Sequence, residues 1–132
     1  MKKSIAIAAG GDSGEYELSV KSAAVVEQHI DAELYNSYII VIRGQEWKYL
    51  GPDGKEYLIN KDDFSLMIDG EKIHFDAVFI AIHGTPGEDG KLQGYLEMIG
   101  IPYTTCDHIT SALTFDKYFC NRVVSSFDIK VA

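Results

Sequence analysis

The sequence predicts one α/β domain, built on an open, mostly parallel β-sheet with helices on both faces. Two stretches, residues 5–9 and 77–82, are apolar at every position, and each leads into a glycine-rich loop followed by a helical pattern. Strands without polar alternation are typical of a parallel sheet that helices cover on both sides. The length of 132 residues fits a single domain.

The first unit consists of a strand, a loop and a helix. Residues 5–9 form the strand, residues 10–15 (GGDSGE) form a loop with three glycines, and residues 16–29 are expected to be helical. This order is typical of the opening of a βαβ unit. The apolar stripe expected to face the sheet consists of Leu18, Val25, Val26 and Ile30.

The middle of the chain changes character after a second strand at residues 32–42. The sequences GPDG at residues 51–54 and DG at residues 69–70 are strong turn signals. Short strand candidates flank both turns, at residues 47–50, 56–59, 66–68 and 72–75. We therefore expect one or two β-hairpins, inserted into the α/β domain at about residues 43–75.

The last part of the chain returns to helices. An amphipathic helix after Gly90 is expected to end at Gly100, and residues 102–105 are expected to form a fourth short strand. Residues 108–127 read as a helical region broken near Phe115, followed by an extended segment at 128–131. The apolar side chains of this helical region are expected to belong to the core: Phe119, Cys120, Val123, Val124 and Phe127.

Composition excludes several classes of function. The chain has 12 basic and 20 acidic residues, a net charge of −8, and no basic stripe, which argues against nucleic-acid binding. The first apolar run stops at Ala9, too early for a signal peptide or a membrane span, so we expect a soluble cytoplasmic protein. Cys106 and Cys120 are expected to be reduced thiols, and the histidines show no metal-ligand spacing.

Two candidate site residues follow the two buried strands. The carboxyl ends of parallel strands meet at one edge of a sheet, where ligands bind, so Glu15 and His83 could face one crevice. The loop that carries Glu15 has no lysine and matches no phosphate-binding motif. A carboxylate there suits a cationic group such as a substrate ammonium.

Taken alone, these residue types also have purely structural interpretations. Glu15 could complement the dipole of the helix that it begins, and His83 could be an ordinary hydrogen-bonded residue at a strand end. Lys117 could be a surface lysine. Glu88 and Asp89 form a carboxylate pair, which we interpret as a turn whose Asp89 caps the next helix.

Three longer motifs resemble the D-alanine–D-alanine ligase family. Residues 83–94 (HGTPGEDGKLQG) resemble its N-terminal signature, residues 10–19 (GGDSGEYELS) its first glycine loop, and residues 111–117 (SALTFDK) a later segment. The motifs occur in the family's order and, with the first strand, span residues 5–117. The stretch at residues 43–75 matches only loosely.

This resemblance implies a function. Such ligases use ATP to phosphorylate the carboxylate of one D-alanine, and the amine of a second D-alanine attacks the acyl phosphate. The dipeptide enters peptidoglycan precursor. By the resemblance, Glu15 holds the ammonium of the first D-alanine, His83 lies beside that substrate, and both count as catalytic. Ser19 matches a substrate-binding serine of the loop, and Lys117 reaches the ATP phosphates.

The family has three domains, and this chain resembles only the first, a Rossmann-like pre-ATP-grasp domain. The resemblance implies that the remaining ATP-grasp domains carry most ATP contacts and the ligands for Mg²⁺ (or Mn²⁺), with none in residues 1–132. It also implies a homodimer, and a fragment that alone is inactive. A D-alanine–D-lactate ligase domain is an alternative. A non-catalytic flavodoxin-like binding module is another, although Gly10 and Gly11 stand where a receiver domain has acidic residues.

Overall fold

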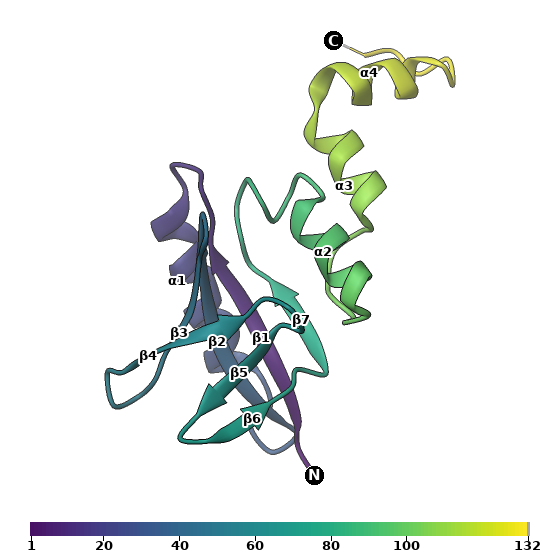
Figure 1. Cartoon of the computed structure of the whole chain (residues 1–132). Coiled ribbons are helices and arrows are strands. Elements are labelled where there is room, and N and C mark those ends of the chain that lie inside the picture. The colour runs from purple at the N-terminus through teal and green to yellow at the C-terminus, as the bar shows by residue number, and fades with distance from the viewer. Residues whose placement is uncertain (132) are drawn as a thin grey trace.

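The computed structural model describes residues 1–131 (Figure 1). Its strands hydrogen-bond into one sheet in the order β6-β5-β4-β3-β2-β1-β7. The strands are β1 (Lys3–Gly10), β2 (Tyr35–Arg43), β3 (Glu46–Leu50), β4 (Glu56–Asn60), β5 (Ser65–Ile68), β6 (Glu71–Ile73) and β7 (Ala77–Ile80). The helices are α1 (Tyr16–His29), α2 (Lys91–Ile99), α3 (His108–Phe115) and α4 (Lys117–Ser125).

The strands that carry the candidate site run parallel, as predicted. Strand β1 lies between β2 and β7, and Ile7 is in register with Ile39 on one side and Phe79 on the other. Residues 6–9 of β1 are completely buried. Because both faces of β1 are covered, its sequence needs no polar alternation, which explains the continuous apolar run.

The predicted insertion is confirmed as two hairpins that continue the same sheet. Strands β3 to β6 pair antiparallel from the outer edge of β2, so the whole sheet is mixed around a parallel centre. The hairpins curl over one face, where Phe64 and Leu66 are fully buried in the main core (Figure 1). The ring of Phe64 packs edge-on against Tyr95 of α2, with 6.1 Å between ring centroids.

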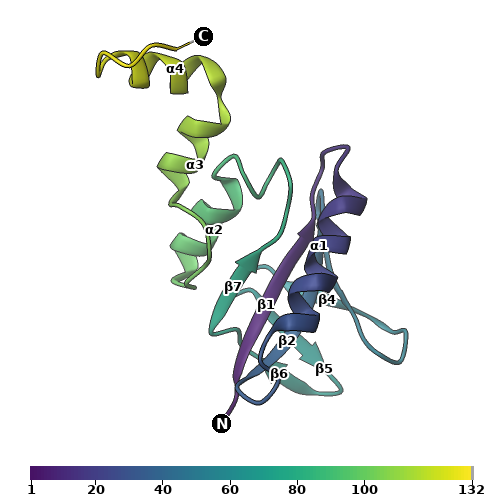
Figure 2. The same ribbon diagram turned by 180° about the vertical axis from the view of Figure 1, so that it is seen from behind.

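The sheet has a helix on each face, as predicted. On one face, α1 packs Ala23 against Ile7 and Ala9 (Figure 2). On the other face, α2 and the curled hairpins together cover β1, with Leu92 and Leu96 buried in the same cluster as Ala6 and Ala8. The parallel strands are therefore covered by α1 on one face and by α2 together with the two hairpins on the other face.

The predicted core stripe of α1 was right only in part. Val26 is partly buried and packs against the cluster around Ile7, but Leu18 and Val25 are 50% and 56% exposed. Ser19 and Ala23 are completely buried in their place. Small side chains on the inner face let the helix backbone come close to β1, and the larger apolar residues beside them are left outside. The periodicity gave the helix its correct bounds but did not identify the face that needs close packing.

The predicted strand at residues 102–105 is reduced to a single parallel bridge between Val78 and Tyr103. The next ladder donor, the backbone N–H of Ile80, bonds to the side-chain Oγ1 of Thr104 at 2.9 Å instead of to a backbone carbonyl. Thr105 then adopts φ +90°, which turns the chain away from the sheet. The Thr104 side chain therefore takes the place of the next backbone acceptor, and the positive φ of Thr105 ends the pairing after a single bridge.

Helices α3 and α4 form an arm that extends beyond the sheet, past the end where the glycine loops lie (Figures 1 and 2). The predicted break is confirmed at Asp116, whose side chain caps α4 by accepting from the N–H of Phe119 at 3.1 Å. The predicted core face at the end of the helical region is wrong, because Phe119 and Val123 of α4 are 58% and 41% exposed and Phe127, just after it, is 72% exposed. Cys120 and Val124 are only partly buried. Residues 128–131 join no strand among residues 1–131.

Candidate functional site

The loops that follow β1 and β7 pack against each other at the carboxyl ends of the parallel strands. Gly10 and Gly11 adopt φ values of +95° and +93°, which favour glycine. A Cβ on Gly11 would lie 2.7 Å from Cγ2 of Ile82 and 2.9 Å from the carbonyl oxygen of Thr85. Only a residue without a side chain therefore allows the second loop to approach the first this closely.

Ser13 joins the two loops through its hydroxyl. It donates to the carbonyl oxygen of His83 at 2.8 Å and accepts from the backbone N–H of Glu15 at 3.2 Å. A second bond runs from the N–H of Asp12 to the carbonyl of Thr85 at 2.9 Å. The structure thus confirms that Glu15 and His83 lie at the same edge of the sheet, and it adds Ser13, which the sequence reasoning did not single out.

A third segment, the turn between β2 and β3, also joins this edge. The carboxylate of Asp12 accepts from the N–H of Gly44 at 2.6 Å, and the guanidinium of Arg43 lies 4.8 Å from the centre of the Tyr16 ring. Asp12 therefore holds the end of β2 on the first glycine loop. The sequence signal for this contact is an acidic residue next to paired glycines.

Ser19 is fully buried and bonds to the backbone at the ends of two strands. Its hydroxyl accepts from the N–H of Gly10 at 2.9 Å and donates to the carbonyl of Ala81 at 2.7 Å. One side chain of α1 thus fixes the start of the first loop relative to the strand that leads to His83. In this arrangement the hydroxyl faces the backbone and not the solvent.

His83 lines a cavity of about 340 Å³ beside α1. Its Nε2 lies 3.3 Å from the hydroxyl of Ser22, which holds the ring toward the helix. Glu88 lines the same cavity, and its carboxylate accepts from the N–H of Gly84 at 2.6 Å. Glu88 therefore stabilises the loop that carries His83, in agreement with its interpretation as part of a turn.

Glu15 lies at the start of α1 without capping it. The side chain is exposed and makes no hydrogen bond to cap the helix, although Glu15 occupies the N-cap position. Since the backbone N–H of Glu15 is held by Ser13, its carboxylate is left facing solvent at the same edge as His83. A carboxylate in this position is available to a cationic ligand.

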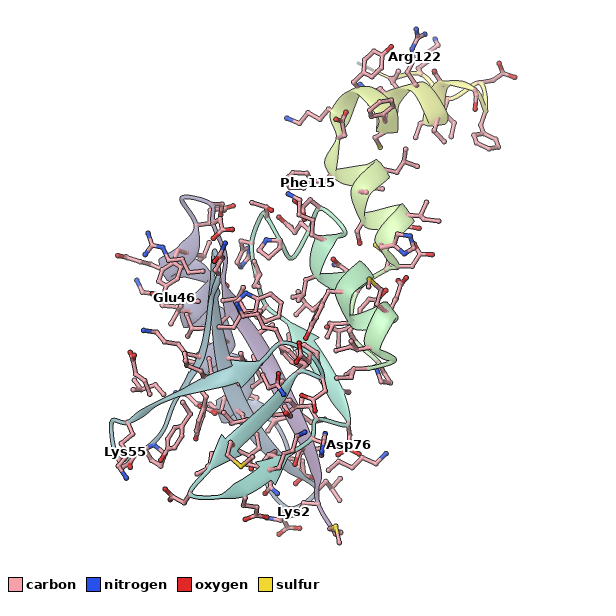
Figure 3. The ribbon with its side chains drawn as sticks, in the orientation of Figure 1. Lys2, Glu46, Lys55, Asp76, Phe115 and Arg122 are labelled. Atoms are coloured by element: carbon pink, nitrogen blue, oxygen red, sulfur yellow. The ribbon has the colours of Figure 1, made fainter. Side chains whose placement is uncertain are left out.

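Lys117 lies apart from these loops. It is the first residue of α4 and is exposed, and its side chain makes no hydrogen bond or ion pair with another of the described residues. The structure thus brings Glu15, Ser19 and His83 together and places Lys117 on the arm. Arg122, which follows it on α4, lies at the outer end of the arm, away from the sheet (Figure 3).

The predicted role of Asp89 at the start of α2 is right only in part. The N-cap position is Gly90, which has φ +84°, and its residue type offers no side chain to cap the helix. The carboxylate of Asp89 nevertheless accepts from the N–H of Lys91, the first residue of α2, at 3.4 Å, and it forms an ion pair with the Lys91 side chain at 2.7 Å. Partial burial raises the pKa of the Asp89 carboxyl, but hydrogen bonds from Lys91 and Thr85 outweigh it, so the pKa lies below its ordinary value of 3.8.

The described part of the chain contains neither a metal-binding cluster nor a helix that could span a membrane. Within residues 1–131 no three side chains of the His, Cys, Asp or Glu type are grouped to hold a metal ion. Over the same residues, every helix is too short or too polar to cross a bilayer. Both cysteines carry free thiols.

Comparison with known proteins agrees with this arrangement. Residues 4–106 match the family described as D-ala D-ala ligase N-terminus. The whole chain is 51% identical to a D-alanine–D-alanine ligase of Parabacteroides distasonis and 49% identical to one of Phocaeicola vulgatus. It spans only 40% and 41% of the length of these two relatives.

Solved structures show the same fold. The D-alanyl-alanine synthetase A of Vibrio cholerae superposes on 97% of this chain with a TM-score of 0.85 at 29% identity, over 38% of its own length. The VanG D-Ala:D-Ser ligase of Enterococcus faecalis superposes on 99% with a TM-score of 0.85 at 32% identity, over 43% of its length. The chain therefore belongs to the D-alanine–D-alanine ligase family and corresponds to the N-terminal region of those enzymes.

Proposed function

We propose that this chain holds the first D-alanine in an ATP-dependent D-alanine–D-alanine ligase that supplies peptidoglycan precursor. The observation that carries the proposal is the Ser13 hydroxyl, which joins the backbone of Glu15 to that of His83. This bridge fixes an acidic and an imidazole side chain at one edge of the sheet, where parallel α/β folds bind ligands.

Each proposed residue supplies a different group to the reaction. The exposed carboxylate of Glu15 accepts a charge-assisted hydrogen bond from the ammonium of the first D-alanine. His83 lies beside that substrate and orients it. Lys117 supplies a cation for the ATP phosphates. Ser19 acts by holding the two loops, since both of its hydrogen bonds go to the backbone.

The reaction proceeds in two steps. A carboxylate oxygen of the first D-alanine attacks the γ-phosphorus of ATP, the bond to the β-phosphate oxygen breaks, and ADP leaves. The amine of the second D-alanine then attacks the carbonyl carbon of the acyl phosphate. Inorganic phosphate leaves with the bonding electron pair, the amine loses a proton, and the dipeptide remains.

The rest of the enzyme lies in the part of the relatives that this chain does not span. We propose that the ligands for Mg²⁺ and most ATP contacts belong to the remaining ligase domains. The exposed apolar residues of α3 and α4 suit a surface that those domains cover. We further propose a homodimer, and a cytoplasmic location where ATP is available.

The test is a ligation assay with the full-length protein. Mixing it with ATP, Mg²⁺ and D-alanine should release phosphate and ADP in equal amounts and yield the dipeptide, while L-alanine should give neither. If D-alanine fails to stimulate phosphate release, the proposed ligase activity is wrong. Binding of D-alanine without turnover would instead favour a non-catalytic module.

A second candidate differs in the amino acid that is joined. The structural similarity to a D-Ala:D-Ser ligase raises D-serine as an alternative second substrate. The same assay with equal concentrations of D-alanine, D-serine and D-lactate distinguishes these products by mass. We expect D-alanyl-D-alanine to dominate, in line with the ligases that match the whole chain at about half identity.

A further inference from the structure

The carboxylate of Glu97 on α2 holds the segment that leads into the arm. Its Oε1 accepts from the hydroxyl of Tyr103 at 2.5 Å and from the backbone N–H of His108 at 3.2 Å. Its Oε2 lies 2.5 Å from Nδ1 of His108. The hydrogen bond from Tyr103 is the main reason that the pKa of Glu97 lies below its ordinary value, so the carboxylate is ionised at neutral pH. Three donors from residues 103–108 thus converge on one anion.

This anion caps α3 from outside the helix. The first backbone N–H groups of a helix have no partner within it. Asp107 accepts from the N–H of Thr110 at 2.8 Å, and Glu97 accepts from the N–H of His108, the first residue of α3. A negative charge at this end also complements the helix dipole. The start of α3 is therefore fixed on α2 by charge as well as by geometry.

The arm has only a narrow attachment to the rest of the described chain. Helix α4 packs chiefly on α3, and α3 packs on α2. At the other end of α2, a Cβ on Gly90 would lie 2.4 Å from the carbonyl oxygen of His108. His108, the first residue of α3, thus contacts Gly90 at one end of α2 and hydrogen-bonds to Glu97 near the other end. Since α2 directly follows the loop of His83, one helix connects the substrate edge to the arm.

A small tilt of α3 at this attachment produces a larger displacement of Lys117 at its far end. Helix α3 has eight residues, so it is about 12 Å long at 1.5 Å per residue. A tilt of roughly 10° at its start would move its far end, and Lys117 just beyond, by about 2 Å. A misplacement of about 1 Å in a catalytic contact can already cost roughly 100-fold in rate.

We propose that Glu97 is a positioning residue for the nucleotide: it fixes α3 so that Lys117 meets the ATP phosphates. This inference rests on the proposed ligase function. It predicts that loss of the Glu97 carboxylate weakens ATP binding through Lys117 and leaves binding of the first D-alanine at Glu15 almost unchanged.

The test uses the full-length enzyme and a double-mutant cycle. Glu97→Ala is expected to raise the KM for ATP by about tenfold or more, with a change of less than about twofold in the KM for the first D-alanine. In a Lys117→Ala background, the same substitution should change the KM for ATP by less than about twofold. Glu33→Ala, which removes an exposed carboxylate at the opposite end of the sheet, is the charge control and should change neither constant.

The outcomes separate this inference from the proposed function. If the unmodified full-length enzyme does not ligate D-alanine, the proposed function fails. If it does, an unchanged KM for ATP in Glu97→Ala overturns the positioning role. Equal losses in both substrate constants, or a further loss in the Lys117→Ala background, also overturn it. Should Glu97→Ala fail to fold, Glu97→Gln and Tyr103→Phe provide the same comparison, each expected to raise the KM for ATP selectively.

Discussion

Replacing Ser19 with alanine should destabilise the protein far more than the loss of one oxygen atom suggests. The buried hydroxyl satisfies the N–H of Gly10 and the carbonyl of Ala81, and the substitution leaves both without their partner. An unsatisfied buried polar group costs about 1–3 kcal/mol. Gly10 is buried and Ala81 partly so, and we therefore expect Ser19→Ala to lower the free energy of unfolding by about 2–4 kcal/mol.

The assay is urea unfolding, followed by the fluorescence of the single tryptophan, Trp47, which packs edge-on against Phe64 in the core. Ser22→Ala is the matched control, because this serine lies on the same helix, is only partly buried and makes one long contact of 3.3 Å to His83. It should cost less than about 1 kcal/mol. Amide exchange at Gly10 should accelerate in Ser19→Ala alone. If both variants unfold at the same urea concentration, the two hydrogen bonds of Ser19 do not stabilise the fold as this reasoning requires.

Three further predictions concern the substrate, the nucleotide and acid. Glu15→Gln in the full-length enzyme should weaken use of the first D-alanine by about 30-fold or more. Glu15 is exposed in this chain, but we expect closure of the remaining domains to exclude water from its pair with the ammonium, and removing one partner of a buried charge pair costs roughly 2–5 kcal/mol. An unchanged constant for the first D-alanine in two-substrate kinetics would mean that Glu15 is only a carboxylate at the start of a helix. Calorimetry on residues 1–132 should detect no ATP binding tighter than about millimolar, and micromolar binding would show that the nucleotide site lies within this chain. Hydrogen bonds from Lys72 and Ser65 lower the pKa of Asp63 from 3.8 to about 2, so their contribution to the β5–β6 hairpin is present above about pH 4 and is lost as the pH falls toward 2. Amide exchange at Ser65 should follow that loss and should not do so in Asp63→Asn.

The sequence predicted the elements better than it predicted the surroundings of their side chains. The helix at residues 16–29 has the predicted bounds, because a glycine loop begins it and its apolar periodicity spans it. The same periodicity selected Leu18 as core, although Ser19 is buried in its place. Amphipathic spacing identifies the apolar residues of a helix. It does not identify the small residues, here Ser19 and Ala23, that let the helix pack closely on the sheet.

The candidate site shows the same division. Parallel strands, each ending in a glycine loop, were enough to place Glu15 and His83 at one edge. The connection through Ser13 could not be deduced, because it depends on how closely two loops that are 70 residues apart approach. The exposed face of α4 could not be deduced either, since a pattern of apolar residues does not say whether the partner that covers them lies within the same 132 residues.

The curled hairpins have a consequence for how this domain can change in evolution or by design. A surface loop can be shortened without loss of core packing, but these hairpins bury Phe64 and Leu66 in the core next to α2. They take the place that a second helix has in a doubly wound fold. Deleting residues 43–75 would expose the Tyr95 face of α2, the helix that begins directly after the loop of His83. A lineage or an engineer that removes the hairpins must therefore supply another apolar cover for α2. The insertion is consequently tied to the packing of the helix that follows the His83 loop, although none of its residues lines the cavity beside His83.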